Sequence, residues 1–245
     1  MATRQYALTD EQELLRATCR RMAVERAAPR AAEIDATAAY PEDLFQMLRE
    51  AGLLGLPIPE AYGGAGAGWL SGCIAVEEFA RVCYNTAYLL IITWGPLGAI
   101  LAAGSEEQKQ QYLGPLARGE LRGCIAVTEP GGGSDVAGMQ TRAERDGDDY
   151  LITGRKCFIT HAPQADFVLL FAKTDPTRGA RGISGFLVEK PTAGLTVGRP
   201  ERKMGGRGLP SCEVSFDGVR VPRRALVGRE HEGFMAGMVG FNRLR

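Results

Sequence analysis

The sequence pattern of the chain changes at the stretch Ala126-Val127-Thr128-Glu129-Pro130-Gly131-Gly132-Gly133-Ser134-Asp135. The apolar run Cys124–Val127 predicts a strand, which stops at Pro130 because proline lacks the N–H that a strand ladder needs. The three glycines let a ligand approach bare backbone N–H groups, and Thr128 and Ser134 add hydroxyls. Such loops are usually turns, and this one fits neither a Walker loop nor a Rossmann fingerprint.

The sequence before this stretch has the pattern of helices. Thr9 and Gln12 form a capping box ahead of apolar residues at helical spacing, and Ser105 and Gln108 form a second one. Between them, the segment Glu42–Glu50 follows a proline and precedes a glycine, as a short helix does. The first part of the chain is therefore expected to be helical throughout.

The sequence after Gly123 has the pattern of strands. Expected strands are Thr141–Glu144, Tyr150–Thr153, Phe167–Phe171, Ile183–Val188, Leu195–Val197 and Cys212–Phe216. Short turns such as Asp146-Gly147 favour antiparallel pairing. A helical pattern returns over Phe234–Arg245. The predicted fold class is α+β: an all-α helical domain over 1–122, an antiparallel β-barrel-like domain over 123–231, and the start of a C-terminal helical bundle over 232–245.

Charge and cysteine content exclude several classes of protein. The 29 basic and 29 acidic side chains balance, so no nucleic-acid partner is expected. The longest apolar run, Ala87–Ala103, is broken by Trp94-Gly95-Pro96, which argues against a membrane span. Met1–Thr9 lacks a signal-peptide core. The six cysteines stand singly, which favours thiols in a reducing cytoplasm over disulfides or a metal site.

Four further segments carry a family resemblance. They are Gly104–Leu113, Gly154–His161, Lys203–Gly205 and Asp217–Pro222. With the glycine loop, in this order and spacing, they resemble the acyl-CoA dehydrogenase family, flavoenzymes that desaturate acyl-CoA thioesters. The resemblance runs over essentially the whole chain. It implies a helical domain, a β domain and a C-terminal helical bundle, of which this chain matches the first two and the beginning of the third.

The resemblance implies an oxidoreductase of fatty acid metabolism with FAD as cofactor. In the family a carboxylate removes the α-proton of the thioester, and a hydride passes from the β-carbon to flavin N5. An electron-transferring flavoprotein is the usual oxidant. Members are homotetramers or dimers, so a homo-oligomer is expected. The site must stabilise the developing enolate with positioned donors, while flavin, thioester and base are held in one stack.

The glycine loop supplies one part of the implied flavin site. By motif match, Val127 and Thr128 should bond the pyrimidine edge of the isoalloxazine ring, and Gly133 belongs to the same cofactor-binding set. Ser134 should reach toward the substrate or the cofactor phosphates. Glu129 is rejected as the base, because a carboxylate between a strand and a proline is usually a hydrogen-bonded loop anchor. Asp135 is interpreted as a turn residue.

The segment Phe158-Ile159-Thr160 should lie along the other flank of the ring. Phe158 stands where many relatives have Trp, and either can shield the flavin edge. Thr160 is a candidate donor to N5 or O4. Without the resemblance, Phe158 and Ile159 would be interpreted as strand core and Thr160 as a hydroxyl bonded to backbone. His161, where the family usually has Asn, is interpreted as a structural or rim residue.

The C-terminal segment resembles the part of the family that contacts the CoA portion, which assigns that role to Asn242 and Arg245. A basic helix end is the competing interpretation. Some relatives carry the catalytic glutamate in this segment, but Leu244 stands there. Others carry it in the bundle, so the expected glutamate lies beyond Arg245 and no catalytic residue is assigned. The chain alone is expected to be inactive.

Two alternative functions stay open at this point. The same fold hosts oxidases and dehydrogenases that act on acyl groups bound to a carrier protein. The chain could also be a non-catalytic or truncated partner subunit of a related complex. Acyl chain length, branching and the physiological electron acceptor do not follow from the sequence.

Overall fold

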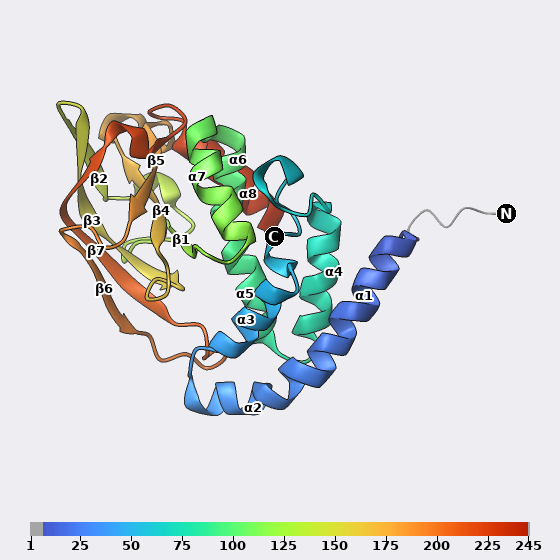
Figure 1. Ribbon diagram of the computed structural model, residues 1–245. Coiled ribbons are helices and arrows are strands. Elements are labelled where there is room, and N and C mark those ends of the chain that lie inside the picture. Colours follow the sequence, from blue (N-terminus) through green and yellow to red (C-terminus); the bar gives the residue numbers. More distant parts are fainter. Residues whose placement is uncertain (1–6, 245) are drawn as a thin grey trace.

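The computed structural model describes residues 7–244. Helices α1–α7 precede the first strand, strands β1–β8 follow, and α8 comes last. Figure 1 shows the strands on one side of the molecule and the helices on the other. The change from helix to strand at Gly123, and the return to helix near Phe234, confirm the predicted order of helical and β regions.

The chain begins with a long bent helix (Figure 1). It consists of α1 (Asp10–Met22), a π-helical turn (Ala23–Ala27) and α2 (Ala28–Thr37). Thr9 caps α1 in the predicted capping box with the side chain of residue 12. Pro29 lies in the first turn of α2 and cannot donate a backbone hydrogen bond, which accounts for the bend next to the π turn.

The helices that follow pack against one another, most of them against α5. They are α3 (Glu42–Glu50), α4 (Gly68–Ala80), α5 (Tyr84–Trp94), α6 (Leu97–Ala103) and α7 (Glu106–Ala117). The predicted capping box of Ser105 and Gln108 starts α7. Within the described residues, Tyr84–Ala103 is the one stretch long and apolar enough to cross a membrane, and 72% of its most apolar window is buried inside the protein. Burial of this kind is the pattern of a core helix.

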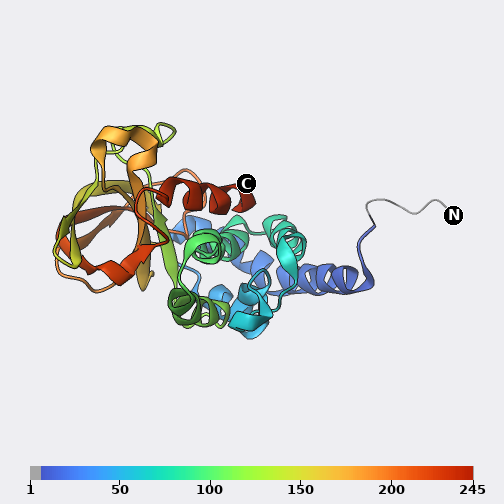
Figure 2. The same ribbon diagram turned by 90° about the horizontal axis from the view of Figure 1, so that it is seen from above.

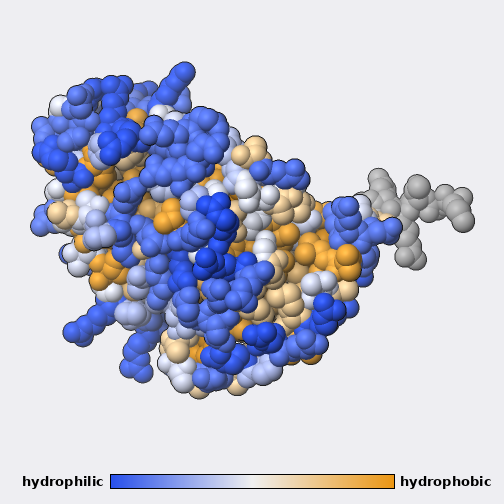
Figure 3. Space-filling model, in the orientation of Figure 1, coloured by the Kyte–Doolittle hydropathy of each residue, from blue (hydrophilic) through white to orange (hydrophobic). Residues whose placement is uncertain are grey.

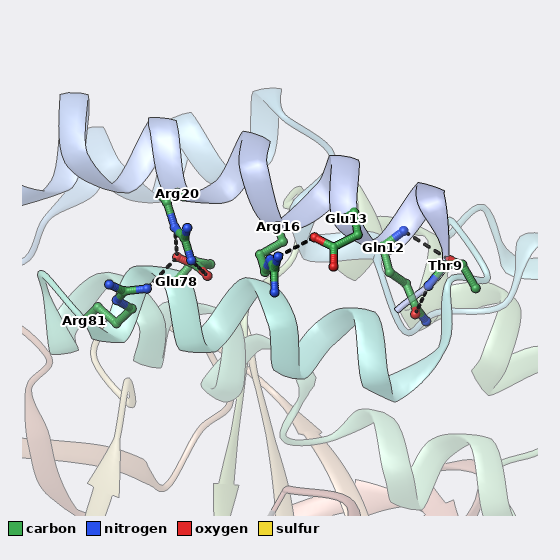
Figure 4. Close-up of polar contacts among 7 residues, drawn as sticks. All are labelled: Thr9, Gln12, Glu13, Arg16, Arg20, Glu78 and Arg81. Carbon is green, nitrogen blue, oxygen red and sulfur yellow. Dashed lines mark hydrogen bonds and ion pairs between the residues drawn. The ribbon is translucent and has the colours of Figure 1, made fainter. Parts of the chain in front are cut away.

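A buried carboxylate joins α1 to α4 (Figure 4). Glu78 is 4% exposed, and its oxygens accept hydrogen bonds of 2.9 and 2.8 Å from the Arg20 guanidinium. Arg81 lies 3.6 Å from the same carboxylate. The hydrogen bond from Arg20 is the main reason why the pKa of Glu78 lies below its usual value. A buried carboxylate is costly unless it is paired, so this contact fixes how α1 lies on α4.

The eight strands form one sheet in the order β6-β7-β3-β2-β4-β5-β8, with β1 paired to β4. Their bounds are β1 (Gly123–Ala126), β2 (Arg142–Asp146), β3 (Asp149–Thr160), β4 (Phe167–Lys173), β5 (Ile183–Glu189), β6 (Leu195–Pro200), β7 (Ser211–Pro222) and β8 (Leu226–Val227). Each predicted strand has a counterpart among them. The two longest strands, β3 and β7, pair antiparallel from end to end.

The β domain differs in two details from the antiparallel, barrel-like form that was expected. β1 runs parallel to β4, with Gly123 opposite Phe167, and β2 meets β4 in parallel at Arg142 and Lys173. The sheet curls around its interior but stays open, with β6 and β8 at its ends (Figure 2). Turn signals reveal hairpins between neighbouring strands, whereas a parallel pair needs a longer crossover that leaves no such signal.

β4 is buried on both faces and so joins the two cores of the molecule. Phe167, Leu169 and Phe171 point into the core shared with the helices. Val168 and Leu170 point into the core enclosed by the curled sheet. This explains why the strand is a continuous apolar run without alternation.

Helix α8 (Gly233–Leu244) returns to lie against α6 and β5 (Figures 1 and 2). The approach depends on glycine. A Cβ at Gly98 of α6 would lie 2.2 Å from the Cα of Gly240, and one at Gly233 would lie 2.4 Å from the Ser184 carbonyl carbon. Small residues therefore set the position of α8 against both partners.

Part of the helical surface is apolar. Figure 3 shows hydrophobic residues gathered near α1 and α4, while hydrophilic and hydrophobic residues are mixed elsewhere on this face. Leu14 of α1 is 70% exposed and Leu70 of α4 is 56% exposed. Large apolar side chains thus stand in solvent on two neighbouring helices.

Candidate functional site

A cavity of about 430 Å³ lies between helix α5, strand β1, the glycine loop, strand β3 and helix α8. Six of the seven residues predicted to bind a cofactor line it: Val127, Thr128, Gly133, Phe158, Ile159 and Thr160. The predicted residues come from segments 25 positions apart and meet because β1 and β3 end at the same cavity. The structure therefore brings most of the predicted set together.

One face of α5 forms the opposite wall, which sequence reasoning did not assign to the site. Tyr88, Ile91, Ile92 and Gly95 line the cavity, whereas Leu89 is fully buried in the helical core. Their spacing of three, four and seven residues places them on a single helix face, and that periodicity was the available signal. Met238 of α8 completes the wall.

The glycines of the loop carry no side chains that would cover its backbone. The loop closes as a tight turn, in which the N–H groups of Glu129 and Gly132 each donate to the other residue's carbonyl, at 3.0 and 3.1 Å. None of Gly131, Gly132 and Gly133 has a positive φ. A Cβ at Gly133 would only touch Thr128, at 3.4 Å. The loop thus leaves its backbone and the Thr128 hydroxyl open toward the cavity.

A buried ion pair supports the loop from beneath. Lys156 of β3 is 0% exposed, and its Nζ donates to Glu129 Oε1 at 2.8 Å and to the Val127 carbonyl at 3.1 Å. Glu129 also accepts from the backbone N–H groups of Gln140 and Thr141, at 2.6 and 3.0 Å. Burial raises the pKa of Glu129, but these hydrogen bonds hold it below the usual value overall. Glu129 is thus the hydrogen-bonded loop anchor that the sequence suggested.

A β-bulge presents Phe158 at the cavity. Two residues of β3, Cys157 and Phe158, face the single residue Glu213 of β7. Phe158 has a φ of 58° and is 65% exposed. The Cys157 N–H donates to the Thr128 carbonyl at 2.9 Å, which ties the bulge to the glycine loop. A left-handed aromatic residue is uncommon and costs free energy, and such strain gathers at functional sites.

His161 follows Thr160 but turns away from the cavity. It is fully buried, its Nε2 lies 2.8 Å from the Tyr40 hydroxyl oxygen, and the two rings stack with centroids 5.4 Å apart. Burial, together with the Arg122 cation, lowers its pKa to about 4. The ring is therefore neutral at pH 7, and its place between the helices and the sheet fits the structural role predicted for it.

Two predicted residues do not line the cavity, and a third lies outside the described residues. Ser134 is exposed in the glycine loop, and Asn242 is exposed on α8. Arg245 lies outside the described residues. Their proposed contacts with substrate or cofactor stay predictions.

The lining within residues 7–244 contains no aspartate or glutamate. Nor does this part of the chain hold a cluster of three or more His, Cys, Asp or Glu side chains that could bind a metal. The cavity as described therefore offers apolar surface, backbone and hydroxyl groups, without a group that could remove a proton from a carbon acid.

Two family models match the chain. One is the acyl-CoA dehydrogenase N-terminal domain, over residues 9–120, and the other is the acyl-CoA dehydrogenase middle domain, over residues 124–219. The chain belongs to the acyl-CoA dehydrogenase family. The predicted recognition and fold class are thereby confirmed, with the sheet mixed and open as described above.

Individual relatives agree with this membership. The sequence is 43% identical over 228 residues to cyclohex-1-ene-1-carbonyl-CoA dehydrogenase of Geobacter metallireducens, which covers 93% of this chain and 60% of that protein. Butyryl-CoA dehydrogenase of Megasphaera elsdenii matches with a TM-score of 0.93 and 34% identity over 98% of this chain and 64% of that one. A chain in the structure described as the electron transferring flavoprotein of Acidaminococcus fermentans matches with a TM-score of 0.94 and 36% identity, over 98% and 63%. The chain thus spans about six tenths of the length of these relatives.

The cavity suits the ring of a flavin, the cofactor type of this family. An isoalloxazine is a flat ring system with apolar faces and a polar edge. Apolar side chains of β1 and β3, among them Ile125 and Ile159, can cover a face, while Thr128 and Thr160 add hydroxyl groups to the lining. Among the described side chains the Thr128 hydroxyl has no hydrogen-bond partner, which leaves it available to a ligand. The residues present therefore fit the group.

Proposed function

We propose that this chain forms the flavin-binding part of an FAD-dependent acyl-CoA dehydrogenase, which desaturates an acyl-CoA thioester between its α- and β-carbons. The observation that carries the proposal is the shared cavity, where six residues predicted from motifs meet an apolar helix face. When bound, FAD supplies the acceptor for the β-hydride. The chain's own residues bind the cofactor, orient it and shield it from solvent.

Several lining residues have a proposed part in holding the cofactor. Val127 and Thr128 bond the pyrimidine edge of the ring, and Thr160 donates a hydrogen bond to N5 or O4. Phe158, raised by the bulge and 65% exposed, covers the ring edge against water and oxygen. The hydrogen bond of 3.1 Å from Lys156 Nζ to the Val127 carbonyl holds the loop in position at the cavity.

The substrate is proposed to enter from the side of α5 and α8. The apolar face with Ile91 and Ile92 suits an acyl chain, and Ser134, Asn242 and Arg245 are assigned to the CoA portion by family match. The lining described within residues 7–244 holds no carboxylate, so we propose that the base comes from a part of the protein other than these residues.

The remaining assignments follow the family. We propose an electron-transferring flavoprotein as oxidant, a homo-oligomer as the working form, and fatty acid metabolism as the setting. The six cysteines are all free, which is in keeping with a reducing cytoplasm as the proposed location.

Titration of FAD into the wild-type chain and two variants tests the proposal. Thr160→Ala and Thr128→Ala each remove one polar partner of the ring, worth on the order of 1 kcal/mol, so FAD should bind about fivefold more weakly with a shifted visible spectrum. Thr196→Ala, on exposed β6, serves as the matched control and should behave as wild type. Unchanged affinity and spectrum in both cavity variants would contradict the proposed site.

A further inference from the structure

The hydroxyl groups of Thr160 and Ser211 face each other across β3 and β7. The two residues are register partners, and their side-chain oxygens lie 3.0 Å apart. Thr160 is half-buried and lines the cavity, whereas Ser211 is 6% exposed and does not line it. Among the described side chains and backbone groups, the Ser211 hydroxyl bonds to Thr160 alone. Ser211 therefore reaches the cavity through Thr160.

The backbones on both sides of this contact are held in place. The His161 N–H, next to Thr160, donates to the Pro210 carbonyl at 2.8 Å, and the Ser211 carbonyl accepts from the Glu201 N–H at 2.8 Å. Because the main chain is fixed, the freedom left to Thr160 is rotation of its side chain. The hydrogen bond to Ser211 restrains that rotation, as cross-strand hydroxyl pairs do.

The number of protons decides the direction of the hydrogen bond. Each hydroxyl carries one proton and two lone pairs, so the contact between Thr160 and Ser211 uses one of the two protons. When Ser211 donates, the Thr160 proton is left for the cavity. When Thr160 donates, only its lone pairs face the cavity. The N5 and O4 atoms of an oxidised flavin are acceptors, so flavin binding favours the first arrangement, in which each hydrogen bond strengthens the next.

We propose that Ser211 is a positioning residue, whose hydroxyl donates to Thr160 and so aims the Thr160 proton at the flavin edge. The proposal rests on the function proposed above, since it takes Thr160 as a partner of the ring. It adds a residue that no motif match assigned and that the cavity lining does not include.

The first test needs no flavin. Three-bond NMR couplings to the Thr160 methyl group report its rotamer in the wild-type chain and in Ser211→Ala, with Ser215→Ala on the same strand as the matched control. We expect a single rotamer in wild type and control, and averaging in Ser211→Ala. A single unchanged rotamer in Ser211→Ala would overturn the proposal.

The second test adds FAD to the same proteins. Ser211→Ala should weaken FAD about fivefold relative to Ser215→Ala, and Ser211→Thr, which restores a hydroxyl, should bring the affinity back. In a Thr160→Ala background, Ser211→Ala should have no further effect, because it acts through the lost hydroxyl. Equal FAD affinity in Ser211→Ala and the control, or an undiminished effect in that background, would overturn the proposal. If the wild-type chain itself does not bind FAD, the proposed function fails. The rotamer measurement still decides whether Ser211 positions the Thr160 side chain or not.

Discussion

Replacing Lys156 by methionine should destabilise the protein by about 3–5 kcal/mol, the range seen when one partner of a buried ion pair is removed. Methionine keeps most of the side chain's length, so the change removes the positive charge and little else. Lys156 is 0% exposed and its partner Glu129 is 7% exposed. Without the ammonium group 2.8 Å away, the carboxylate would keep only the backbone N–H groups of Gln140 and Thr141. Its pKa should then rise, since only the backbone hydrogen bonds are left to offset burial.

Urea unfolding measures this loss as a shift of the midpoint at constant slope. The double variant Lys156→Met, Glu129→Gln should regain about 1–3 kcal/mol relative to the sum of the single changes, because it leaves no unpaired charge. Arg118→Met breaks the exposed pair with Glu120 and is the control, expected to have little effect. An effect of Lys156→Met as mild as that of Arg118→Met, or simple addition of the two changes at the buried pair, would show that this ion pair does not support the loop.

Three further outcomes follow from the structure. Gly98→Ala should destabilise by about 1–3 kcal/mol in a thermal melt, because the new Cβ would lie 2.2 Å from the Gly240 Cα; an unchanged melt would show that α8 can move aside freely. His161 has its folded pKa lowered to about 4, below the unfolded value of about 6.5, so its burial should cost stability progressively, by up to about 3 kcal/mol, as pH falls from about 6.5 to about 4. His161→Gln should remove that part of the pH dependence in urea unfolding, and an identical pH profile would contradict it. Residues 1–245 mixed anaerobically with FAD and a panel of acyl-CoAs should not bleach the flavin, since loss of a general base lowers rates by about 10²–10⁴-fold; rapid bleaching would reveal a base, with Glu129 the first to mutate.

Features that depend on a few neighbouring residues could be predicted from the sequence. The capping boxes at Thr9 and Ser105 start α1 and α7 as expected, and every strand inferred from alternation or apolar runs has a counterpart. The cavity's β side was found because its residues lie in two compact motifs. The α5 wall was within reach too, since Tyr88 and Ile92 share one helix face.

Features that depend on distant pairing could not be predicted. β1 pairs with β4 across some forty residues, and Lys156 meets Glu129 from another strand. The bulge that raises Phe158 arises from the register of β3 on β7, which no local pattern encodes. The glycine loop shows a milder case: none of its glycines has a positive φ, and an added Cβ would meet only ordinary contacts or open space, so the expected approach of a ligand to its backbone stays a prediction.

Methyl NMR during a flavin titration tests the central claim, that the cavity between α5 and β3 holds the ring. Four isoleucines line that cavity: Ile91, Ile92, Ile125 and Ile159. Others are buried away from it and serve as internal controls, among them Ile34, Ile58 and Ile152. Addition of FAD should shift the methyl signals of the first set and leave the second unchanged, while AMP, which lacks the ring, should shift neither. FAD-induced shifts confined to the second set, or no shifts at all, would contradict the account.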